Sequence, residues 1–313
     1  MKILITGVHG FVGSNLVKEL SKNNVIYGLD IVAPMKEGVR FTFSWDYLDK
    51  PGEIPEVDAI IHLAGKAHDT KNKSAAEVYF KVNTGLTEKI FDWFLKQSKC
   101  KKFVFFSTAK AAADKVEGIL TEDVIPCPVG PYGESKIKAE EYILSRIREL
   151  ENSKQVYIFR PCMIHGPGTK GNLNLLYNVV RKGIPWPLGA FENRRTFTSV
   201  ENICFAVNGV LTKDVPSGIY NMGDDETLST NELIEEICKS LGKKAHIWRL
   251  PKGLMNGVAK VGGWLHLPLN PERLRKLTEN YISSNEKIKK ALGVERMPVD
   301  ARTGLQMTLK SFR

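Results

Sequence analysis

Short apolar runs alternate with longer helix-like segments through the first half of the chain. The apolar runs are rich in Val, Ile and Phe and hardly alternate with polar residues, as is typical of strands buried on both faces. Such strand–helix–strand repetition predicts an α/β fold, a doubly wound parallel sheet covered by helices on both sides. The expected strands are Lys2–Thr6, Val25–Asp30, Ala59–Leu63, Phe103–Ser107 and Val156–Arg160, and the expected helices are Val12–Lys22, Glu77–Gln97 and Ser135–Leu150.

The pattern changes after about residue 165, where turns rich in Gly and Pro separate shorter elements. A chain of 313 residues has room for one large domain or two modest ones. We therefore predict a parallel-sheet domain over 1–165, to which the chain returns around 190–220. The range 166–313 is expected to form mainly a smaller, mixed second domain.

The charge balance favours an anionic partner. Lys and Arg number 45 and Asp and Glu 35, which gives a net charge of +10. Nucleic acid is not expected, because the basic runs Lys96–Lys102 and Arg273–Lys276 are short and lack interleaved aromatic residues.

No run approaches the roughly 18 apolar residues of a membrane span. Met1 leads directly into a strand pattern with no signal peptide, so we expect a cytoplasmic protein.

Cysteine and histidine usage gives no sign of a disulfide framework or a metal site. The five cysteines are odd in number and widely scattered, which indicates reduced thiols. His62 and His68 have no nearby acid at ligand spacing, so no metal is expected.

A glycine-rich turn, Gly7-Val8-His9-Gly10-Phe11-Val12-Gly13, joins the first expected strand to the first expected helix. Glycine permits the tight turn and lets backbone N–H groups approach a pyrophosphate at the helix N-terminus. Asp30 ends the second strand, close to the usual offset for an acid that binds ribose hydroxyls. Because a carboxylate there repels a 2′-phosphate, the cofactor is expected to be NAD and not NADP. Asp46-Tyr47 and Ala64-Gly65 follow later strand regions and are open as cofactor contacts or ordinary loop residues.

Tyr132 and Lys136 open the third expected helix four residues apart and so share one face. A nearby ammonium lowers the pKa of a phenol, so Tyr132 is a candidate acid/base for moving a hydroxyl proton while hydride leaves the same carbon. Ser107 and Thr108 end the fourth strand, where open α/β sheets place ligands. The Thr108 hydroxyl is a candidate partner for the reacting oxygen.

Taken together, these residues resemble the extended short-chain dehydrogenase/reductases that modify nucleotide sugars, the NAD-dependent epimerase/dehydratase family. The resemblance covers nearly the whole chain and implies a Rossmann domain, NAD as cofactor and a homodimer formed by the helices that contain Asn83 and Tyr132. The residues that carry it are Gly7–Gly13, Asp30, His62–Gly65, Asn83, Phe105–Thr108, Tyr132–Lys136, Arg160-Pro161, Gly166–Gly168 and Arg194–Val200.

The resemblance also implies residue roles. Tyr132 matches the acid/base tyrosine, Lys136 the lysine that also holds the nicotinamide ribose, and Thr108 the assisting hydroxyl. The expected cofactor contacts are Gly7, Gly10, Phe11, Val12, Gly13, Asp30, Asp46, Tyr47, Leu63, Ala64, Gly65, Asn83, Ser107, Tyr132, Lys136 and Pro161.

The second domain is implied to bind the nucleotide sugar, a UDP-sugar or a related compound. Arg195 matches an arginine that grips the substrate diphosphate, with Arg273 as a further candidate. Lys170-Gly171-Asn172 matches a loop that contacts the sugar, which makes Asn172 a substrate candidate together with Thr108.

The segment Gly166–Gly189 is most similar to polysaccharide-pathway members that are UDP-hexose 4-epimerases or C4-ketoreductases. These two activities use the same residues and both stay open. A 4,6-dehydratase is disfavoured, because Ala109-Lys110-Ala111 stands where dehydratases carry an Asp-Glu pair. Ala112-Ala113 and Met163 also depart from the commonest epimerase pattern. A non-catalytic relative would usually lack the tyrosine or the lysine, and both are present.

The apolar segment Leu254–Leu269 has cationic flanks. Contact with a membrane or a lipid-linked sugar is one interpretation. We favour a helix that packs over the substrate pocket, because its glycines and Pro268 interrupt a long amphipathic face.

Overall fold

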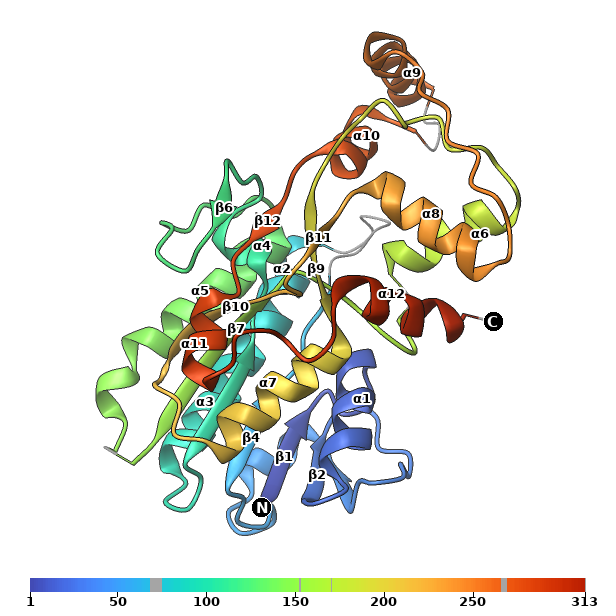
Figure 1. Ribbon diagram of the computed structural model, residues 1–313. Coiled ribbons are helices and arrows are strands. Elements are labelled where there is room, and N and C mark those ends of the chain that lie inside the picture. The colour runs from blue at the N-terminus through green and yellow to red at the C-terminus, as the bar shows by residue number, and fades with distance from the viewer. Residues whose placement is uncertain (68–74, 152, 170, 266–268, 313) are drawn as a thin grey trace.

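The structure is a computed structural model that describes residues 1–67, 75–151, 153–169, 171–265 and 269–312. Its centre is a seven-stranded sheet of order β10-β7-β5-β4-β1-β2-β3 in which every neighbouring pair is parallel (Figure 1). The predicted α/β fold class is therefore confirmed. The strands are β1 (Lys2–Thr6), β2 (Val25–Leu29), β3 (Phe41–Phe43), β4 (Ala59–His62), β5 (Lys102–Phe106), β7 (Gln155–Pro161) and β10 (Gly218–Met222).

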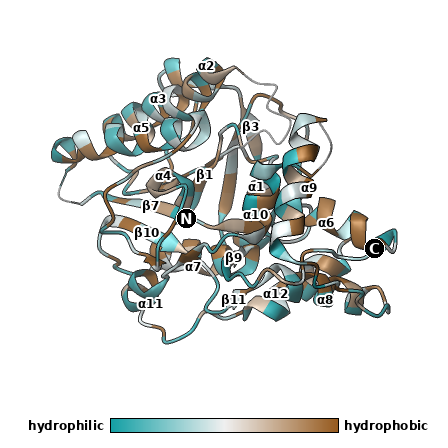
Figure 2. Ribbon diagram, turned by 90° about the horizontal axis from the view of Figure 1, so that it is seen from above, coloured by the Kyte–Doolittle hydropathy of each residue, from teal (hydrophilic) through white to brown (hydrophobic). Residues whose placement is uncertain are grey.

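Helices cover both faces of this sheet, and two apolar cores follow from the period-two alternation of its strands. On β1, Ile3 and Ile5 enter one core and Leu4 enters the other, and all three are fully buried. Burying one such side chain stabilises the fold by about 1.5–3 kcal/mol. In Figure 2 the central strands are mostly brown, whereas the surrounding helices show both colours. The first core contains α1 (Phe11–Leu20), α7 (Val200–Thr212) and α11 (Glu286–Leu292), and the second contains α3 (Gly85–Lys96) and α5 (Pro131–Ser145).

The expected helix over 77–97 is interrupted. It consists of α2 (Ala76–Tyr79), a π-helical turn η2 (Phe80–Thr84) and α3. Such turns often mark functional sites, because they rotate one side chain out of the regular helical register. Here the π-helical turn carries Asn83, which is completely buried.

A second set of elements lies beyond the carboxyl ends of the large sheet's strands (Figure 1). It contains the sheet β11-β9-β8, a small β12-β6 pair and an apolar core of its own. Between these elements the chain returns to the large sheet through α7 and β10, and later through α11. The elements are β6 (Ile119–Leu120), β8 (Met163–His165), β9 (Arg195–Ser199), β11 (Thr227–Leu228), β12 (Ile282–Ser283), α4 (Ala109–Ala112), α6 (Asn172–Arg181), α8 (Thr230–Ser240), α9 (Lys252–Trp264), α10 (Pro271–Thr278) and α12 (Ala301–Lys310).

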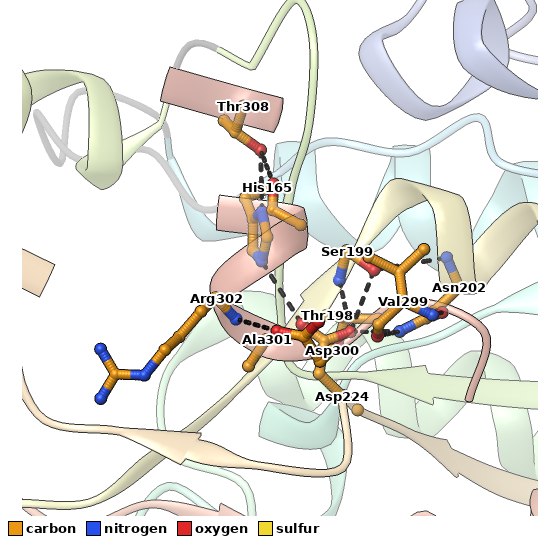
Figure 3. A network of polar contacts seen from close by, with 12 residues as sticks. His165, Thr198, Ser199, Asn202, Asp224, Val299, Asp300, Ala301, Arg302 and Thr308 are labelled. Atoms are coloured by element: carbon orange, nitrogen blue, oxygen red, sulfur yellow. Dashed lines mark hydrogen bonds and ion pairs between the residues drawn. The ribbon is translucent and has the colours of Figure 1, made fainter. Parts of the chain in front are cut away.

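A buried polar cluster holds α12 against these elements (Figure 3). One carboxylate oxygen of Asp224 accepts hydrogen bonds from the Ser199 N–H at 2.9 Å, the Ser199 hydroxyl at 3.0 Å and the Asn202 amide at 2.7 Å. The other oxygen lies 3.5 Å from Nε2 of His165. Nδ1 of His165 lies 2.9 Å from the hydroxyl of Thr308 on α12. The cluster therefore joins β8, β9, α7 and α12.

Candidate active site

The glycine turn between β1 and α1 is shaped by close backbone approaches. Gly7 has φ +67°, and a Cβ there would lie 2.9 Å from the backbone nitrogen of Ala64. A Cβ at Gly13 would lie 2.4 Å from the Gly7 carbonyl oxygen, which no side chain tolerates. Gly10 precedes α1 at the N-cap position and has no side chain with which to cap the helix. The first N–H groups of α1 are therefore suited to an anionic group.

Asp30 lies beside this turn. One of its carboxylate oxygens accepts a hydrogen bond from the His9 N–H at 3.1 Å, and the other accepts one from Ile31 N–H at 2.8 Å. The ring atom Nε2 of His9 is buried and has no partner among the described residues. The structure thus brings together the glycine turn and the acid that the sequence analysis assigned to a dinucleotide.

Asp46 and Tyr47 lie farther along the sheet, in a short 3-10 helix after β3. The Asp46 carboxylate pairs with Lys50 at 2.7 Å and accepts a hydrogen bond from Ser44. The hydrogen bond from Lys50 lowers the pKa of Asp46 to about 2. Tyr47 packs on Phe43, with ring centroids 5.4 Å apart. Both residues therefore have local partners.

The loop after β4 is tied to β1 and to Asn83. The hydroxyl of Thr6 accepts hydrogen bonds from the N–H groups of Leu63 at 3.1 Å and Ala64 at 2.9 Å. Gly65 has no room for a side chain, because a Cβ would lie 2.9 Å from Oδ1 of Asn83 and 3.2 Å from Nζ of Lys136. Five predicted residues, Leu63, Ala64, Gly65, Asn83 and Lys136, are thereby brought together at the carboxyl ends of β1 and β4.

Asn83 connects this loop to α5. Its Oδ1 accepts a hydrogen bond from Lys66 N–H at 2.7 Å, and its amide donates to the Ser135 hydroxyl at 2.9 Å. Ser135 lies between Tyr132 and Lys136, so the π-helical turn positions the helix that carries both candidates.

His62, at the end of β4, is buried beneath the same loop. Its ring lies 2.6 Å from the Thr6 hydroxyl through Nδ1 and 2.9 Å from the Thr87 hydroxyl through Nε2. Burial, with the nearby charge of Lys136, holds the pKa of His62 well below its usual range. His62 is therefore an uncharged side chain that supports the site through its contacts with the Thr6 and Thr87 hydroxyls.

Tyr132 and Lys136 share one face of α5, as their spacing predicts. The side chains of Tyr132 and Thr108 are hydrogen-bonded, and the Tyr79 ring packs edge-on against Tyr132 at 6.4 Å. Lys136 is buried, and its ammonium donates to the Phe106 carbonyl at 2.8 Å. The phenol, the hydroxyl and the ammonium thus converge where β5 ends.

The prediction that the Lys136 ammonium lowers the pKa of the Tyr132 phenol is wrong for the protein chain considered alone. Burial raises the pKa of its phenol, the hydrogen bond with Thr108 lowers it and neighbouring Tyr79 raises it further. The ammonium of Lys136 does not dominate, since it is directed to a backbone carbonyl. Burial lowers the pKa of Lys136 to about 8, and the carboxylate of Glu140 opposes that shift. Tyr132 is therefore a neutral phenol at neutral pH.

A buried ion pair that the sequence analysis missed lies one helical turn beyond Lys136. Both carboxylate oxygens of Glu140 lie 3.1 Å from Nε of Arg160, and Oε2 also accepts from Nη2 at 2.6 Å. The Ser107 hydroxyl donates to the same carboxylate. This pair links α5 to the ends of β5 and β7, the strands that lead to Thr108 and Pro161. Its only signal in the sequence is the i,i+4 series of Tyr132, Lys136 and Glu140 together with Arg160 at a strand end.

The predicted substrate residues lie in the second set of elements. Arg195 begins β9, is half-buried and donates a hydrogen bond to the Lys276 carbonyl on α10, the helix that also carries Arg273. Arg273 is exposed. Asn172 is exposed at the first position of α6, and Lys170 lies outside the described residues.

Tyr281 connects Arg195 to the segment that follows Thr108. It forms a backbone bridge with Arg195, and its hydroxyl donates to the Ala113 carbonyl at 2.9 Å. The Lys110 ammonium lies 4.7 Å from the centre of its ring. Behind this segment, a Cβ at Gly133 would lie 2.7 Å from the Lys110 carbonyl oxygen. The strand of Arg195 and the start of α5 therefore flank one segment, 109–113.

The described residues contain no group of three His, Cys, Asp or Glu side chains that could hold a metal ion. His68 lies outside this part of the chain. None of the helices in the described ranges is long and apolar enough to span a membrane.

Comparison with known proteins gives matches over most of the chain. The UDP-glucose 4-epimerase of Vibrio cholerae is 32% identical over 266 residues, which cover 80% of this chain and 78% of that protein. An N-acetyl-alpha-D-glucosaminyl-diphospho-ditrans,octacis-undecaprenol 4-epimerase of Escherichia coli O157:H7 is 26% identical over 298 residues, covering 92% and 84%.

Among solved structures, UDP-glucuronic acid 4-epimerase from Bacillus cereus in complex with NAD superposes with a TM-score of 0.75, at 20% identity, and covers 100% of this chain and 98% of that one. At this identity the likeness shows a shared fold. The model of the NAD dependent epimerase/dehydratase family matches residues 3–223. That match confirms the resemblance and the expected cofactor: the chain belongs to the NAD dependent epimerase/dehydratase family.

Proposed function

We propose that this protein is an NAD-dependent epimerase of a UDP-hexose that transfers hydride at C4 of the sugar, in the cytoplasmic synthesis of polysaccharide precursors. The observation that carries the proposal is the convergence of Tyr132, Thr108 and Lys136 at the end of β5. The Vibrio cholerae relative, a UDP-glucose 4-epimerase, supports the reaction and the substrate class.

The residues fit a bound dinucleotide. The glycine turn leaves the first N–H groups of α1 without a side-chain cap. In the same turn, the buried ring nitrogen Nε2 of His9 has no hydrogen-bond partner among the described residues. Asp30 lies beside the turn. The loop Leu63–Gly65 and Lys136 would hold the nicotinamide end. When bound, NAD accepts and returns the hydride, and its positive charge lowers the pKa of a nearby phenol.

The acid/base work falls to Tyr132. In oxidation, the tyrosinate takes the proton of the sugar hydroxyl as hydride leaves the same carbon. In reduction, the neutral phenol returns a proton to the carbonyl oxygen. The Thr108 hydroxyl, already bonded to the phenol, orients the reacting oxygen. The Lys136 ammonium lies in the same buried site, so its positive charge stabilises the tyrosinate when Tyr132 loses its proton.

The proposed substrate site lies in the second half. Residues 1–165, with the return around 190–220, hold NAD, and 166–313 hold mainly the nucleotide sugar. Arg195 and Arg273 bind the diphosphate, for which guanidinium geometry is suited, and Asn172 contacts the sugar. We propose a homodimer formed by the helices of Asn83 and Tyr132. Light scattering at micromolar concentration should give twice the chain mass, and a monomer would contradict it.

The second candidate activity is reduction of a UDP-4-keto-sugar, and it is favoured by one observation. Ala112-Ala113 and Met163 depart from the commonest epimerase pattern. A dTDP-4-dehydro-6-deoxyglucose reductase of Escherichia coli is also among the relatives, at 26% identity. Dehydration is not proposed, although a dTDP-glucose 4,6-dehydratase of Streptomyces griseus is 25% identical, because Ala109-Lys110-Ala111 offers no acidic pair.

Cofactor accounting separates these activities. The purified protein is incubated with UDP-glucose, UDP-galactose, UDP-N-acetylglucosamine and UDP-glucuronic acid, and sugar products are followed by NMR while NADH is followed by absorbance. Formation of the 4-epimer without net change in NADH supports the epimerase. Stoichiometric loss of NADH with a 4-keto-sugar supports the reductase. Loss of water from the sugar, or no turnover of any nucleotide sugar, would contradict the proposal.

A further inference from the structure

Helix α9 (Lys252–Trp264) has two apolar sides, and only one of them is packed. Met255, Ala259 and Gly262 are buried at helical spacing where α9 packs on the apolar core of the second set of elements and on α10. The expected packing of this segment as a helix is present, whereas its expected place over the substrate pocket stays a prediction. The other side carries a row of apolar residues at positions i, i+4, i+7 and i+11, which are Leu254, Val258, Val261 and Leu265.

This row is open to solvent. Leu254 is 54% exposed, Val258 46%, Val261 54% and Leu265 52%, and Trp264 at the end of the helix is 81% exposed. In Figure 1, α9 lies at the outermost end of the molecule, far from β1. Single exposed apolar residues are ordinary, but a continuous helical row of four with a tryptophan indicates an interaction surface.

The charge around α9 identifies the partner. Residues 243–265, which are α9 and the segment before it, contain five Lys or Arg residues and no Asp or Glu, which gives +5 out of the net +10 of the chain. Lys244, Arg249, Lys252 and Lys260 are exposed. A protein partner with an apolar groove would not require so strong an excess of positive charge. An anionic lipid surface would, because its headgroups attract basic residues while its acyl boundary accepts apolar ones.

We propose that α9 docks in the plane of an anionic phospholipid membrane surface. Leu254, Val258, Val261 and Trp264 enter the boundary between headgroups and acyl chains, where Trp is favoured. Lys260, beside this row, extends its aliphatic stem along the boundary and holds its ammonium group among the phosphates. This interaction is independent of which sugar the active site accepts.

The position of α9 gives this docking a consequence for the proposed substrate site. Helix α9 packs on α10, and the Lys276 carbonyl of α10 accepts a hydrogen bond from Arg195. A docked membrane would therefore lie one helix away from the residue assigned to the substrate diphosphate.

Co-sedimentation with vesicles tests the proposal. The full chain is mixed with vesicles of phosphatidylcholine alone, or of phosphatidylcholine with phosphatidylglycerol, at low and high salt. We expect binding to the anionic vesicles at low salt, and at least about a fivefold smaller bound fraction on neutral vesicles or at high salt. Equal binding to both vesicle types, or no binding to either, would overturn the proposal.

Three variants identify the surface. Leu254→Ser with Val258→Ser and Val261→Ser should reduce the bound fraction by about fivefold or more, and Lys260→Gln should reduce it by about threefold or more. The matched control is Ile125→Ser with Met307→Ser, two residues that are 87% and 40% exposed elsewhere on the molecule. It should bind as the unmodified protein does.

Two measurements keep the result interpretable. Thermal unfolding of the triple variant should match the unmodified protein, because exposed substitutions change stability little. Light scattering without vesicles should give the same mass for both. A smaller mass for the triple variant would show that α9 binds a second copy of the chain, and retained vesicle binding by a folded triple variant would show that another surface is used. Either result overturns the proposal.

Discussion

The two halves of the molecule bury charge in different ways. Under the candidate active site, the carboxylate of Glu140 pairs with Arg160 through several short contacts and also accepts from Ser107. In the cluster of Figure 3, the Asp224 carboxylate is held mainly by neutral donors from Ser199 and Asn202, and the nearest ring nitrogen of His165 is 3.5 Å away.

This difference indicates what each cluster does. A buried ion pair is not an efficient way to gain stability, since desolvation offsets much of the attraction. The pair of Glu140 and Arg160 instead holds Lys136 near a negative charge and aligns α5 with two strand ends. The Asp224 cluster contains none of the residues assigned to the reaction. Its polar contacts hold α12 against β8, β9 and α7.

The largest effect should come from the chemistry that the first cluster supports. Tyr132→Phe removes the proton donor and should lower turnover by about 10²–10⁴-fold, the usual contribution of general acid–base catalysis. NAD binding and the thermal midpoint should change little, because the ring is kept. Epimer or alcohol formation is measured by NMR. A variant with most of its turnover would contradict the assignment.

Glu140→Gln should destabilise the protein strongly. It leaves the Arg160 guanidinium buried without its counter-charge, a loss of about 3–5 kcal/mol in the free energy of unfolding. Urea unfolding followed by circular dichroism measures it. A loss below about 1 kcal/mol would show that the pair is dispensable.

The first cluster should also make stability depend on pH in the alkaline range. The pKa of Lys136 is about 8 in the folded protein and 10.5 in the ordinary state, so the unfolded chain binds more protons between these values. The free energy of unfolding contributed by Lys136 should therefore rise from pH 8 to 10.5, by at most about 3 kcal/mol. Comparison with Lys136→Met isolates this contribution, since the variant should lack the rise. Equal slopes in the two proteins would contradict the shift.

Arg195→Met tests the substrate side. Removal of a guanidinium from a diphosphate should raise KM for the UDP-sugar by about 10–100-fold, as expected for hydrogen bonds to charged groups. The affinity for NAD should stay unchanged, and isothermal titration measures it. An equal loss for both ligands would place Arg195 elsewhere in the mechanism.

The smallest effect is expected in the second cluster. Asp224→Asn keeps a carbonyl oxygen that accepts from Ser199 and Asn202, so we expect a loss of about 1 kcal/mol. The same urea experiment compares it with Glu140→Gln. If Asp224→Asn cost as much as Glu140→Gln, the contrast between the two clusters would be wrong.

Local patterns predicted much of the fold and part of the site. The uninterrupted apolar runs predicted five strands of the large sheet, and the glycine spacing with Asp30 predicted two features that the structure places side by side. The i,i+4 spacing of Tyr132 and Lys136 predicted their common helix face. These predictions depend on short segments in which residue type alone determines backbone or face.

Long-range contacts account for what the sequence did not reveal. Spacing placed Lys136 near Tyr132 but did not show that its ammonium is bonded to the Phe106 carbonyl, so the direction of the phenol pKa was wrong. The pairing of Glu140 with Arg160 joins a helix to a strand twenty residues away. The short strand β10 was not predicted, because its five residues are identifiable as a strand only from their pairing with β7.

The pairing of β10 with β7 has a consequence for biosynthesis. As the chain leaves the ribosome, β7 emerges more than fifty residues before its outer neighbour, with β8, α6, β9 and α7 translated in between. Until then the seven-residue β7 presents an unpaired edge. Every residue of this strand except Gln155 is buried in the folded protein. This open edge favours aggregation of the nascent polypeptide, and we expect a first half expressed alone to retain it, because β10 would be missing.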